Sequence, residues 1–293
     1  MSEQDYPFLK GHGTENDFVL LPDHDGTRHG DLDPARVARL CDRRAGIGGD
    51  GVLRVVRTAA YAAAREHADP AEAEWFMDYR NSDGSLSEMC GNGVRVFARH
   101  LLEEGLVAPG RPIPVGTRAG VKVIEVDGDR ITVDMGRPRL LGDTEVAVGP
   151  AHWAATHVDM GNPHAVAFLA DGQTLDPSGP VGPLTSEPGF DAEVYPHGVN
   201  VEFVERRGAG HVAMRVHERG SGETRSCGTG ACAVAVATAL ADGRAPGEGG
   251  GGAGDATYRV DLPGGTLEIT WTADDRVLMS GPAVVVARGT TAL

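Results

Sequence analysis

Short apolar runs rich in β-branched residues recur along much of the chain, separated by glycine, proline and polar residues. Runs of this length and composition are typical of β-strands, because branched side chains suit a pleated surface. Two pairs are joined by short turns, Asp127-Gly128-Asp129 and Pro263-Gly264-Gly265, whose glycines can adopt positive φ. The pattern therefore predicts hairpins within largely antiparallel or mixed sheets. The predicted strands are Val121–Val126, Arg130–Met135, His211–His217, Tyr258–Leu262, Thr266–Thr270 and Ala283–Ala287.

Two helices are predicted, and their apolar patterns differ. In Gly91–Glu104 apolar residues recur at helical spacing along one face, and Gly105 follows as a C-terminal cap. Gly228–Ala241 carries no charge and is apolar on nearly every face, which is typical of a buried helix. We therefore expect it to be a core helix wrapped by strands. The apolar face of the first helix consists of Val94, Phe97, Ala98, Leu101 and Leu102.

Two further segments have biased composition. Thr58–Glu74 is rich in alanine and contains Asp69-Pro70, whereas Gly247–Gly254 is almost entirely glycine. Neither segment has the periodicity of a strand or a long helix. We interpret both as irregular surface loops that carry no chemistry.

Charge narrows the possible partners. The chain has 293 residues, of which 27 are Lys or Arg and 42 are Asp or Glu, so its net charge is −15. Scattered acidic charge repels phosphate backbones and anionic lipid. The longest apolar run, Ala231–Ala241, is shorter than the roughly 20 residues that a membrane-spanning helix needs. The sequence thus predicts no nucleic-acid partner and no membrane partner, and its length allows one large or two modest domains.

Cysteine usage depends on the compartment. The segment Met1–Asp5 is acidic and lacks the basic and apolar parts of a secretory signal, so we expect a cytoplasmic protein. Because the cytoplasm is reducing, the four cysteines are expected to be thiols with a catalytic or packing role. They are Cys41, Cys90, Cys227 and Cys232.

A short motif occurs twice. Cys90-Gly91-Asn92-Gly93 and Cys227-Gly228-Thr229-Gly230 each stand immediately before a predicted helix, and the two helices are of similar length. A single Cys-Gly-x-Gly before a helix is weak evidence, because a tight entry turn also accounts for it. Two copies in matching positions of two halves indicate an internal repeat with a shared function.

The start of a helix gives this motif its chemistry. The first amide groups of a helix lack intrahelical partners, and the aligned peptide dipoles place partial positive charge there. That environment stabilises a thiolate and attracts a carboxylate, and the glycines keep the approach open. If Cys90 and Cys227 faced one α-carbon from opposite sides, one could remove a proton while the other supplied one. Such a pair would invert a stereocentre, with the carbanion stabilised by preorganised dipoles.

The cysteines are also compatible with simpler roles. Cys41 and Cys232 suit simple packing, since a buried cysteine behaves as a small hydrophobic residue. Cys90 and Cys227 could alternatively form a redox pair, although no Cys-x-x-Cys occurs. A metal site is also conceivable, but His164 and Glu218 are isolated in sequence and no ligand cluster accompanies them.

Several motifs together resemble the diaminopimelate epimerase family and follow that family's order. The resemblance extends over nearly the whole chain. The motifs are Lys10-Gly11-His12-Gly13-Thr14-Glu15-Asn16-Asp17-Phe18, Gly46-Ile47-Gly48-Gly49-Asp50, Asn81-Ser82-Asp83-Gly84-Ser85, Met89-Cys90-Gly91-Asn92-Gly93, Met160-Gly161-Asn162-Pro163-His164, Gly198-Val199-Asn200, Glu218-Arg219-Gly220-Ser221-Gly222-Glu223-Thr224 and Cys227-Gly228-Thr229-Gly230.

The resemblance implies an α/β fold of the α+β type with two pseudo-symmetric domains. Each domain would be a curled, mainly antiparallel or mixed sheet around a central helix, with the active site in the cleft between them. Residues 1–134 with 280–293 would form one half and residues 135–279 the other. The implied protein is a homodimeric, cofactor-independent isomerase that converts LL-diaminopimelate to the meso isomer for lysine and peptidoglycan synthesis.

The resemblance also implies roles for individual residues. Cys90 and Cys227 would be the acid/base pair, and His164 and Glu218 would adjust the proton affinity of the sulfurs. No metal is expected. The implied substrate-binding residues are Asn16, Asn81, Gly91, Asn92, Asn162, Asn200, Glu218, Arg219, Gly228 and Thr229.

Some of these roles have competing interpretations. Asn81 and Asn162 equally suit ordinary turns. Glu218 and Arg219 are adjacent, so on a strand they would point to opposite faces, and a bend at Gly220 would be needed for both to reach one ligand.

The sequence departs from the family pattern at two positions. Gly51 stands where some members carry a substrate-contacting glutamine, so that contact is absent or replaced by water. Glu15 stands where glycine is frequent, next to Asn16.

Two other classes of function stay open. A proline racemase or a phenazine-type isomerase would share the fold, but the second of these lacks paired cysteines, and Arg219 with Glu218 suits a substrate with a distal charged group. A non-catalytic amino-acid-binding module would not need a second sulfur.

Overall fold

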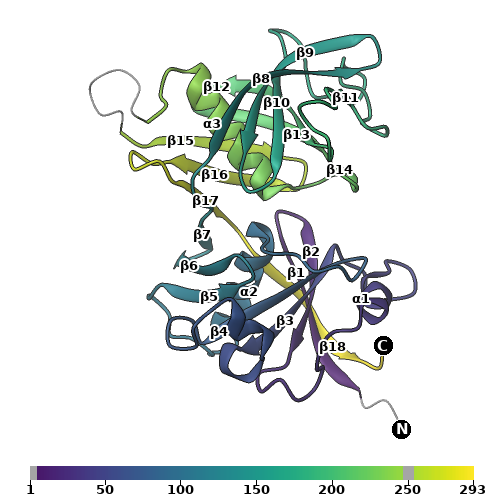
Figure 1. Cartoon of the computed structure of the whole chain (residues 1–293), viewed down its shortest axis with the longest axis vertical. Helices are drawn as coiled ribbons and strands as arrows, with labels where there is room; N and C mark the ends of the chain where they lie inside the picture. The colour runs from purple at the N-terminus through teal and green to yellow at the C-terminus, as the bar shows by residue number, and fades with distance from the viewer. Residues whose placement is uncertain (1–4, 247–253) are drawn as a thin grey trace. The chain divides into compact units, whose positions relative to one another are not determined.

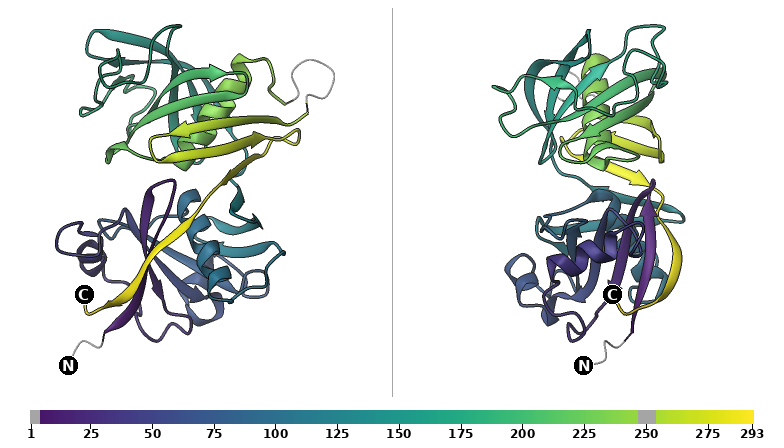
Figure 2. Two further views of the ribbon diagram at one scale, coloured as in Figure 1. Left: turned by 180° about the vertical axis from the view of Figure 1, so that it is seen from behind. Right: turned by 90° about the vertical axis from the view of Figure 1, so that its right-hand side faces the viewer.

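A computed structural model describes residues 5–246 and 254–293. Most of the glycine-rich segment 247–254 therefore lies outside the described residues. The chain divides into two compact units, residues 1–133 with 281–293 and residues 134–280 (Figure 1). The last strand returns to the first unit, where it lies beside the first strand of the chain (Figure 2).

The first unit is a mixed sheet with two helices. Its strands pair in the order β18-β1-β2-β3-β4-β5-β6-β7, with β2–β3 and β4–β5 parallel and the other neighbours antiparallel. The strands are β1 (Tyr6–Gly13), β2 (Asn16–Pro22), β3 (Gly51–Arg57), β4 (Trp75–Asn81), β5 (Ile113–Thr117), β6 (Gly120–Asp127), β7 (Arg130–Asp134) and β18 (Val284–Thr291). The helices are α1 (Pro34–Cys41) and α2 (Gly91–Glu103).

The second unit has the same plan. Its main strands pair in the order β8-β9-β10-β12-β13-β15-β16-β17, with β10–β12 and β13–β15 parallel and the other described pairings antiparallel. These strands are β8 (Arg139–Val148), β9 (Ala151–Asp159), β10 (Pro163–Phe168), β12 (Asn200–Gly208), β13 (His211–Glu218), β15 (Ala256–Leu262), β16 (Gly265–Trp271) and β17 (Val277–Gly281). Two short strands, β11 (Gly189–Phe190) and β14 (Gly222–Thr224), extend it, and its helix is α3 (Gly228–Ala241).

The two pairing orders correspond strand by strand in direction. In each unit the long helix connects two parallel strands, β4 to β5 through α2 and β13 to β15 through α3. Each helix contacts strands from across its own sheet, so each sheet curls around its helix. The predicted repeat of two mixed sheets with central helices is thus confirmed.

The two long helices match their apolar patterns. On α2, Val94, Phe97, Ala98 and Leu101 are buried, and Gly105 adopts a φ of 66° directly after the helix end. Nearly all of α3 is buried, as expected for a helix without a polar face.

Strand boundaries differ from the predicted ones where pairing extends an element. The hairpin turns shorten to two residues, Gly128-Asp129 and Pro263-Gly264, because Asp127 and Gly265 are already paired in strands. The strand predicted at Ala283–Ala287 runs from Val284 to Thr291, since β1 provides partners along that length.

Helix α1 was not anticipated. Its start is capped by Asp33, whose side chain accepts a hydrogen bond from the amide of Ala35 at 3.3 Å, and proline occupies the first helical position. The helix buries Val37, Leu40 and Cys41 in an apolar cluster against β2 and β3.

Segment 58–74 is irregular and mostly exposed, as predicted, with two 3₁₀ turns at Thr58–Ala60 and Ala63–Glu66, but part of it packs against the sheet. Tyr61, Ala64 and Ala68 form a buried cluster with Phe76 of β4. Alanine is small enough to lie buried beneath an aromatic ring, so its abundance does not distinguish a loop from a packed segment.

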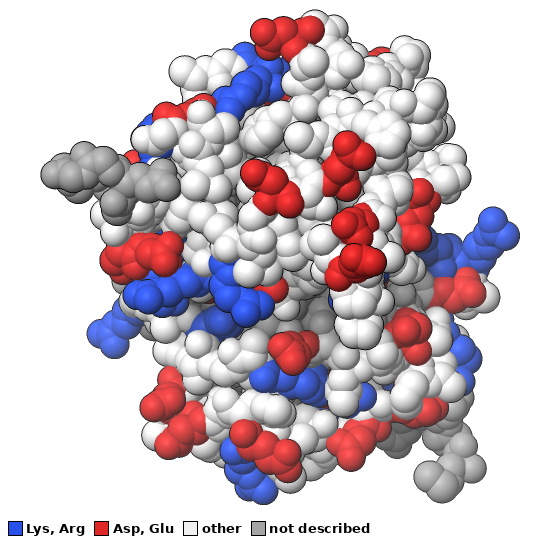
Figure 3. All heavy atoms as spheres, turned by 45° about the horizontal axis from the view of Figure 1, so that its top comes forward, with Lys and Arg blue, Asp and Glu red and all other residues white. Residues whose placement is uncertain are grey.

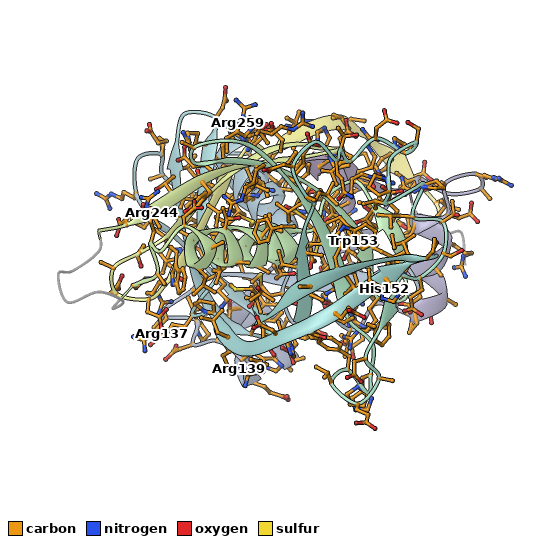
Figure 4. The ribbon with its side chains drawn as sticks, turned by 90° about the horizontal axis from the view of Figure 1, so that it is seen from above. Arg137, Arg139, His152, Trp153, Arg244 and Arg259 are labelled. Carbon is orange, nitrogen blue, oxygen red and sulfur yellow. The ribbon has the colours of Figure 1, made fainter. Side chains whose placement is uncertain are left out.

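The second unit has a further core on the outer side of its sheet. Figure 4 labels two neighbours on β9, His152 and Trp153. Trp153 is buried against Phe203 with ring centroids 5.1 Å apart, whereas His152 is exposed. Alternation along the strand thus separates a core face from a solvent face.

The surface agrees with the scattered charge of the sequence. On the face drawn in Figure 3, acidic and basic side chains are interspersed, without a continuous basic stripe. Among the residues that the structure describes, no helix is long and apolar enough to cross a membrane.

Candidate active site

Cys90 is the residue that caps α2. It has extended backbone angles (φ −136°, ψ 121°), and its Sγ accepts a hydrogen bond from the amide of Gly93 at 3.4 Å. The amides of Gly91 and Asn92 belong to the same first turn, where the helix dipole places partial positive charge. The side chain of Cys90 is half-buried.

Cys227 caps α3 in the same way. Its backbone angles (φ −117°, ψ 112°) are similar, and its Sγ accepts from the amide of Gly230 at 3.4 Å. The Oγ1 of Thr229 lies 3.6 Å from the sulfur. Each unit of the repeat therefore places a thiol sulfur and the first amides of a helix together.

Asn16 connects Cys90 to a polar network. Its Nδ2 donates to Asp50 Oδ2 at 2.7 Å, which turns Oδ1 toward the thiol. That oxygen accepts from Cys90 Sγ at 3.6 Å and from Asn92 Nδ2 at 3.2 Å. Asp50 is held in turn by Arg43 at 2.7 Å. The structure thus brings three of the predicted site residues together at the start of α2.

The Cys227 thiol is more buried than the Cys90 thiol, and two carboxylates act on it. It is 6% exposed, and burial, followed by the charges of Glu218 and Glu202, raises its pKa well above the usual range. Hydrogen bonds from Thr229 and Gly230 act in the opposite direction. In the substrate-free protein this environment favours the protonated thiol.

His164 is completely buried and has oxygen partners at both ring nitrogens. Its Nδ1 lies 2.7 Å from Glu202 Oε1, and its Nε2 lies 3.1 Å from Asn162 Oδ1. The His164 ring is therefore held between the Glu202 carboxylate and the Asn162 side-chain amide.

Three further predicted residues lie around the end of β13. Asn200 Oδ1 accepts from the amide of Arg219 at 2.9 Å, and the Arg219 guanidinium donates to His197 O at 3.1 Å. Glu218 accepts a short hydrogen bond from Thr224. Gly220 follows with a φ of 78°, so the chain turns where the sequence required a bend.

The structure accounts for Asn81 and for the two departures from the family pattern, Gly51 and Glu15. Asn81 forms the expected turn, with its Nδ2 3.0 Å from Ser85 Oγ. At Gly51 an added Cβ would lie 2.5 Å from the carbonyl oxygen of Arg80, so the backbone leaves no room for a side chain. Glu15 adopts a φ of 62°, which accounts for the preference for glycine in this turn.

Sequence reasoning missed two acidic residues of the site, Asp50 and Glu202. Asp50 ends the motif Gly46-Ile47-Gly48-Gly49-Asp50, but the sequence predicted no role for it. Glu202 stands between Val201 and Phe203 in a buried strand, and a carboxylate inside an apolar run was the available signal. Among residues 5–246 and 254–293, no group of three or more His, Cys, Asp or Glu side chains could hold a metal ion.

Solved structures define the class of this fold. A PhzF-family phenazine biosynthesis protein from Bacillus anthracis matches with a TM-score of 0.67 at 15% identity, over 98% of this chain and 99% of its own. A hydroxyproline epimerase from Agrobacterium vitis matches with a TM-score of 0.60 at 17% identity, over 98% and 92%. The fold is therefore the one shared by PhzF-like and proline racemase-like proteins.

Sequence similarity identifies the family within that class. The family model described as diaminopimelate epimerase matches residues 8–141 and 156–286. A diaminopimelate epimerase from Streptomyces coelicolor is 61% identical, with 96% of this chain and 94% of the relative covered. One from Thermobifida fusca is 50% identical, with 96% of each covered. The chain belongs to the diaminopimelate epimerase family, which confirms the predicted resemblance.

Proposed function

We propose that this protein interconverts LL- and meso-diaminopimelate without a cofactor. Cys90 and Cys227 are the two acid/base groups, one acting as thiolate and the other as thiol. The observation that supports this best is the matched geometry of the two caps, where each sulfur lies 3.4 Å from a helix-start amide. Residues 1–134 with 280–293 and 135–279 act as the two halves of the enzyme.

The proposed reaction needs no oxidant. A thiolate removes the α-proton from one face, and the carbanion then takes a proton from the thiol on the other face. The amides of Gly91 and Asn92, with those of Gly228 and Thr229, bind the reacting carboxylate and stabilise the developing charge. The sulfurs exchange roles in each turnover, so a second proton transfer with solvent restores the starting state.

Other residues recognise the distal part of the substrate and tune the sulfurs. Arg219 binds the distal carboxylate, while amide oxygens and the Glu218 carboxylate bind the distal ammonium. Burial is the main cause of the raised pKa of Cys227, and the charge of Glu218 raises it further. His164, whose Nδ1 lies 2.7 Å from Glu202 Oε1, adjusts the proton affinity of the sulfurs as well. The proposed binding asparagines are Asn16, Asn81, Asn162 and Asn200.

Deuterium incorporation tests this function. Incubation of the reduced protein with LL-diaminopimelate in deuterium oxide is expected to give meso product with α-deuterium, without added pyridoxal phosphate or metal. Proline, offered in parallel, should not exchange, because it lacks the distal charged group. Absence of exchange from diaminopimelate under reducing conditions would refute the assignment.

A homodimer and a cytoplasmic location belong to the same proposal, and sedimentation and cell fractionation test them.

Asp50 provides a second test, because it fixes the amide of Asn16. Asp50→Ala removes a charge-assisted hydrogen bond of the kind that contributes about 1.5–3 kcal/mol, so kcat/KM should fall by about tenfold or more. The matched control is Asp25→Ala, since Asp25 is exposed and its hydrogen bonds go to Thr27. Steady-state kinetics on both variants provide the measurement. Equal kcat/KM values for the two variants would contradict a role of Asp50 in the site.

A further inference from the structure

The two helix starts have matched backbones but different side chains beneath them. A Cβ added at Gly93 would lie 3.3 Å from a Leu53 methyl carbon and 3.5 Å from the Phe18 ring. A Cβ added at Gly230 would lie 2.7 Å from Glu202 Oε1. The first helix therefore starts over apolar side chains, and the second starts over a carboxylate.

Strand register shows that these side chains occupy equivalent positions. Phe18 is paired with the first residue of β3, and Leu53 lies two residues further along that strand. His164 is paired with the first residue of β12, and Glu202 lies two residues further along. The pair His164 and Glu202 in one unit thus replaces Phe18 and Leu53 in the other.

Packing does not account for a carboxylate at this position. Glu202 is fully buried, and although Oε1 is paired with His164, Oε2 has no hydrogen-bond partner among the described residues. Burying a charge is costly, and replacing a buried ion pair by apolar residues is often neutral or stabilising. Because the same fold is built with Phe18 and Leu53 in the first unit, stability does not require the ionisable pair.

The Glu202 carboxylate acts on Cys227 across Gly230. The sulfur lies 3.3 Å and the carboxylate oxygen 2.7 Å from the Cβ position that Gly230 leaves empty. A larger residue at 230 would separate the two groups, so glycine here serves close approach as well as helix entry.

Other ionisable groups surround the pair. Burial raises the pKa of Glu202, His164 of β10 acts against this through its charge and hydrogen bond, and the charge of Glu218 on β13 raises it further. The charge of Glu218 also raises the pKa of Cys227. Tyr195 and His157 lie on the other face of the sheet, with ring centroids 4.6 Å apart. Burial, with Glu202 as a lesser cause, raises the pKa of Tyr195 to about 12, so Tyr195 stays neutral at physiological pH.

We propose that Glu202 is a positioning residue of the Cys227 site, which orients His164 and places a carboxylate beneath the first turn of α3, next to the Cys227 sulfur. This deepens the proposed epimerase function and rests on it. The consequence is that two sulfurs with the same backbone setting ionise differently. The asymmetry fixes which sulfur holds the proton before substrate binds.

Two substitutions separate the roles of charge and orientation. Glu202→Gln removes the charge but keeps an oxygen that can accept from His164, whereas Glu202→Leu removes both and copies the residue found at 53. We follow alkylation of each cysteine by iodoacetamide against pH, using mass spectrometry of the peptides in the substrate-free protein. In Glu202→Gln the Cys227 midpoint is expected to move to lower pH by about one unit, because a like charge is lost. The Cys90 midpoint in the same sample is the internal reference and should not move.

Kinetics provide the second readout. The pH dependence of kcat should shift with the Cys227 midpoint in Glu202→Gln, with kcat lower by about tenfold and KM little changed. Loss of the His164 contact should lower kcat further in Glu202→Leu, by about a hundredfold in total. Glu205→Gln is the matched control, because Glu205 lies on the same strand and pairs with Arg207 at 3.1 Å.

The possible results separate a role in the site from a role in packing. A Cys227 midpoint that stays in place in Glu202→Gln, or moves equally in Glu205→Gln, would overturn the proposal. If Glu202→Leu failed to fold, the Gln variant alone would still give this answer. If the parent protein failed to exchange the α-proton, the epimerase function would be refuted, whereas the alkylation result would still decide the role of Glu202.

Discussion

Replacing either Cys90 or Cys227 with alanine is expected to lower kcat by at least about a thousandfold, since each variant loses one of two acid/base groups. The reason lies in the two-sided chemistry. With one sulfur, a proton that is removed can return only to the face it left, so inversion stops. Proton nuclear magnetic resonance of the substrate in deuterium oxide measures both exchange and inversion.

The other two cysteines offer matched controls. Cys41 lies in the α1 cluster, where burial raises its pKa to about 11, and Cys232 lies within the buried body of α3. Cys41→Ala and Cys232→Ala should retain turnover after correction for the fraction folded. Full activity in either Cys90→Ala or Cys227→Ala would exclude the two-base scheme.

The repeat was the part of the fold that could be predicted best. A helical spacing of apolar positions predicted α2, and the absence of any charge predicted α3 as a core helix. Cys-Gly-x-Gly then linked the two helices as copies. These signals are local in the sequence, so they are readable without tertiary structure.

What escaped prediction depends on contacts between distant segments. Helix α1 is only eight residues long, so the helical spacing of Val37, Leu40 and Cys41 covers little more than one turn, and packing against β2 and β3 stabilises the helix. Segment 58–74 contains small residues whose burial depends on Phe76. The role of Glu202 depends on His164, which lies on a neighbouring strand, and on Gly230. Both residues are far from Glu202 in the sequence.

The chemical difference between the two helix starts also depends on residues that are distant in the sequence. The motif repeat predicted a sulfur at the start of each helix, because it recorded only the cap and its glycines. The side chains beneath the caps come from other strands, and they differ between the units. A sequence repeat therefore predicts a shared backbone conformation at the two caps. The ionisation of each sulfur depends on residues outside the motif.

Acid is expected to destabilise the first unit, residues 1–133 with 281–293, between about pH 6.5 and pH 4. Burial is the main cause that lowers the pKa of His29 and of His100 from 6.5 to about 4, and neither ring nitrogen of either residue has a hydrogen-bond partner among the described residues. In the window between these values the unfolded chain binds protons that the native state excludes. Stability is therefore fully present above about pH 6.5 and falls as the pH decreases toward 4. The loss is on the order of 3 kcal/mol for His100, which is 1% exposed, against a total of about 5–15 kcal/mol for a typical domain.

Hydrogen exchange of the α2 amides measures this loss, because that helix lies in the core of the first unit. His100→Leu removes the titrating group from a site that is 1% exposed, so the variant should lose less stability than the parent between pH 6.5 and 4. His67→Gln is the control, since His67 is exposed in the same unit and the substitution should leave the pH dependence as in the parent. If protection of α2 decreased equally with acid in the parent and in His100→Leu, neutral burial of His100 would not be the source of the acid sensitivity. Carboxylates such as Asp17, whose ion pairs with Lys10 and Arg43 hold its pKa far below the usual range against the effect of burial, would lose their contribution only at still lower pH. The histidines must therefore act first as the solution is acidified.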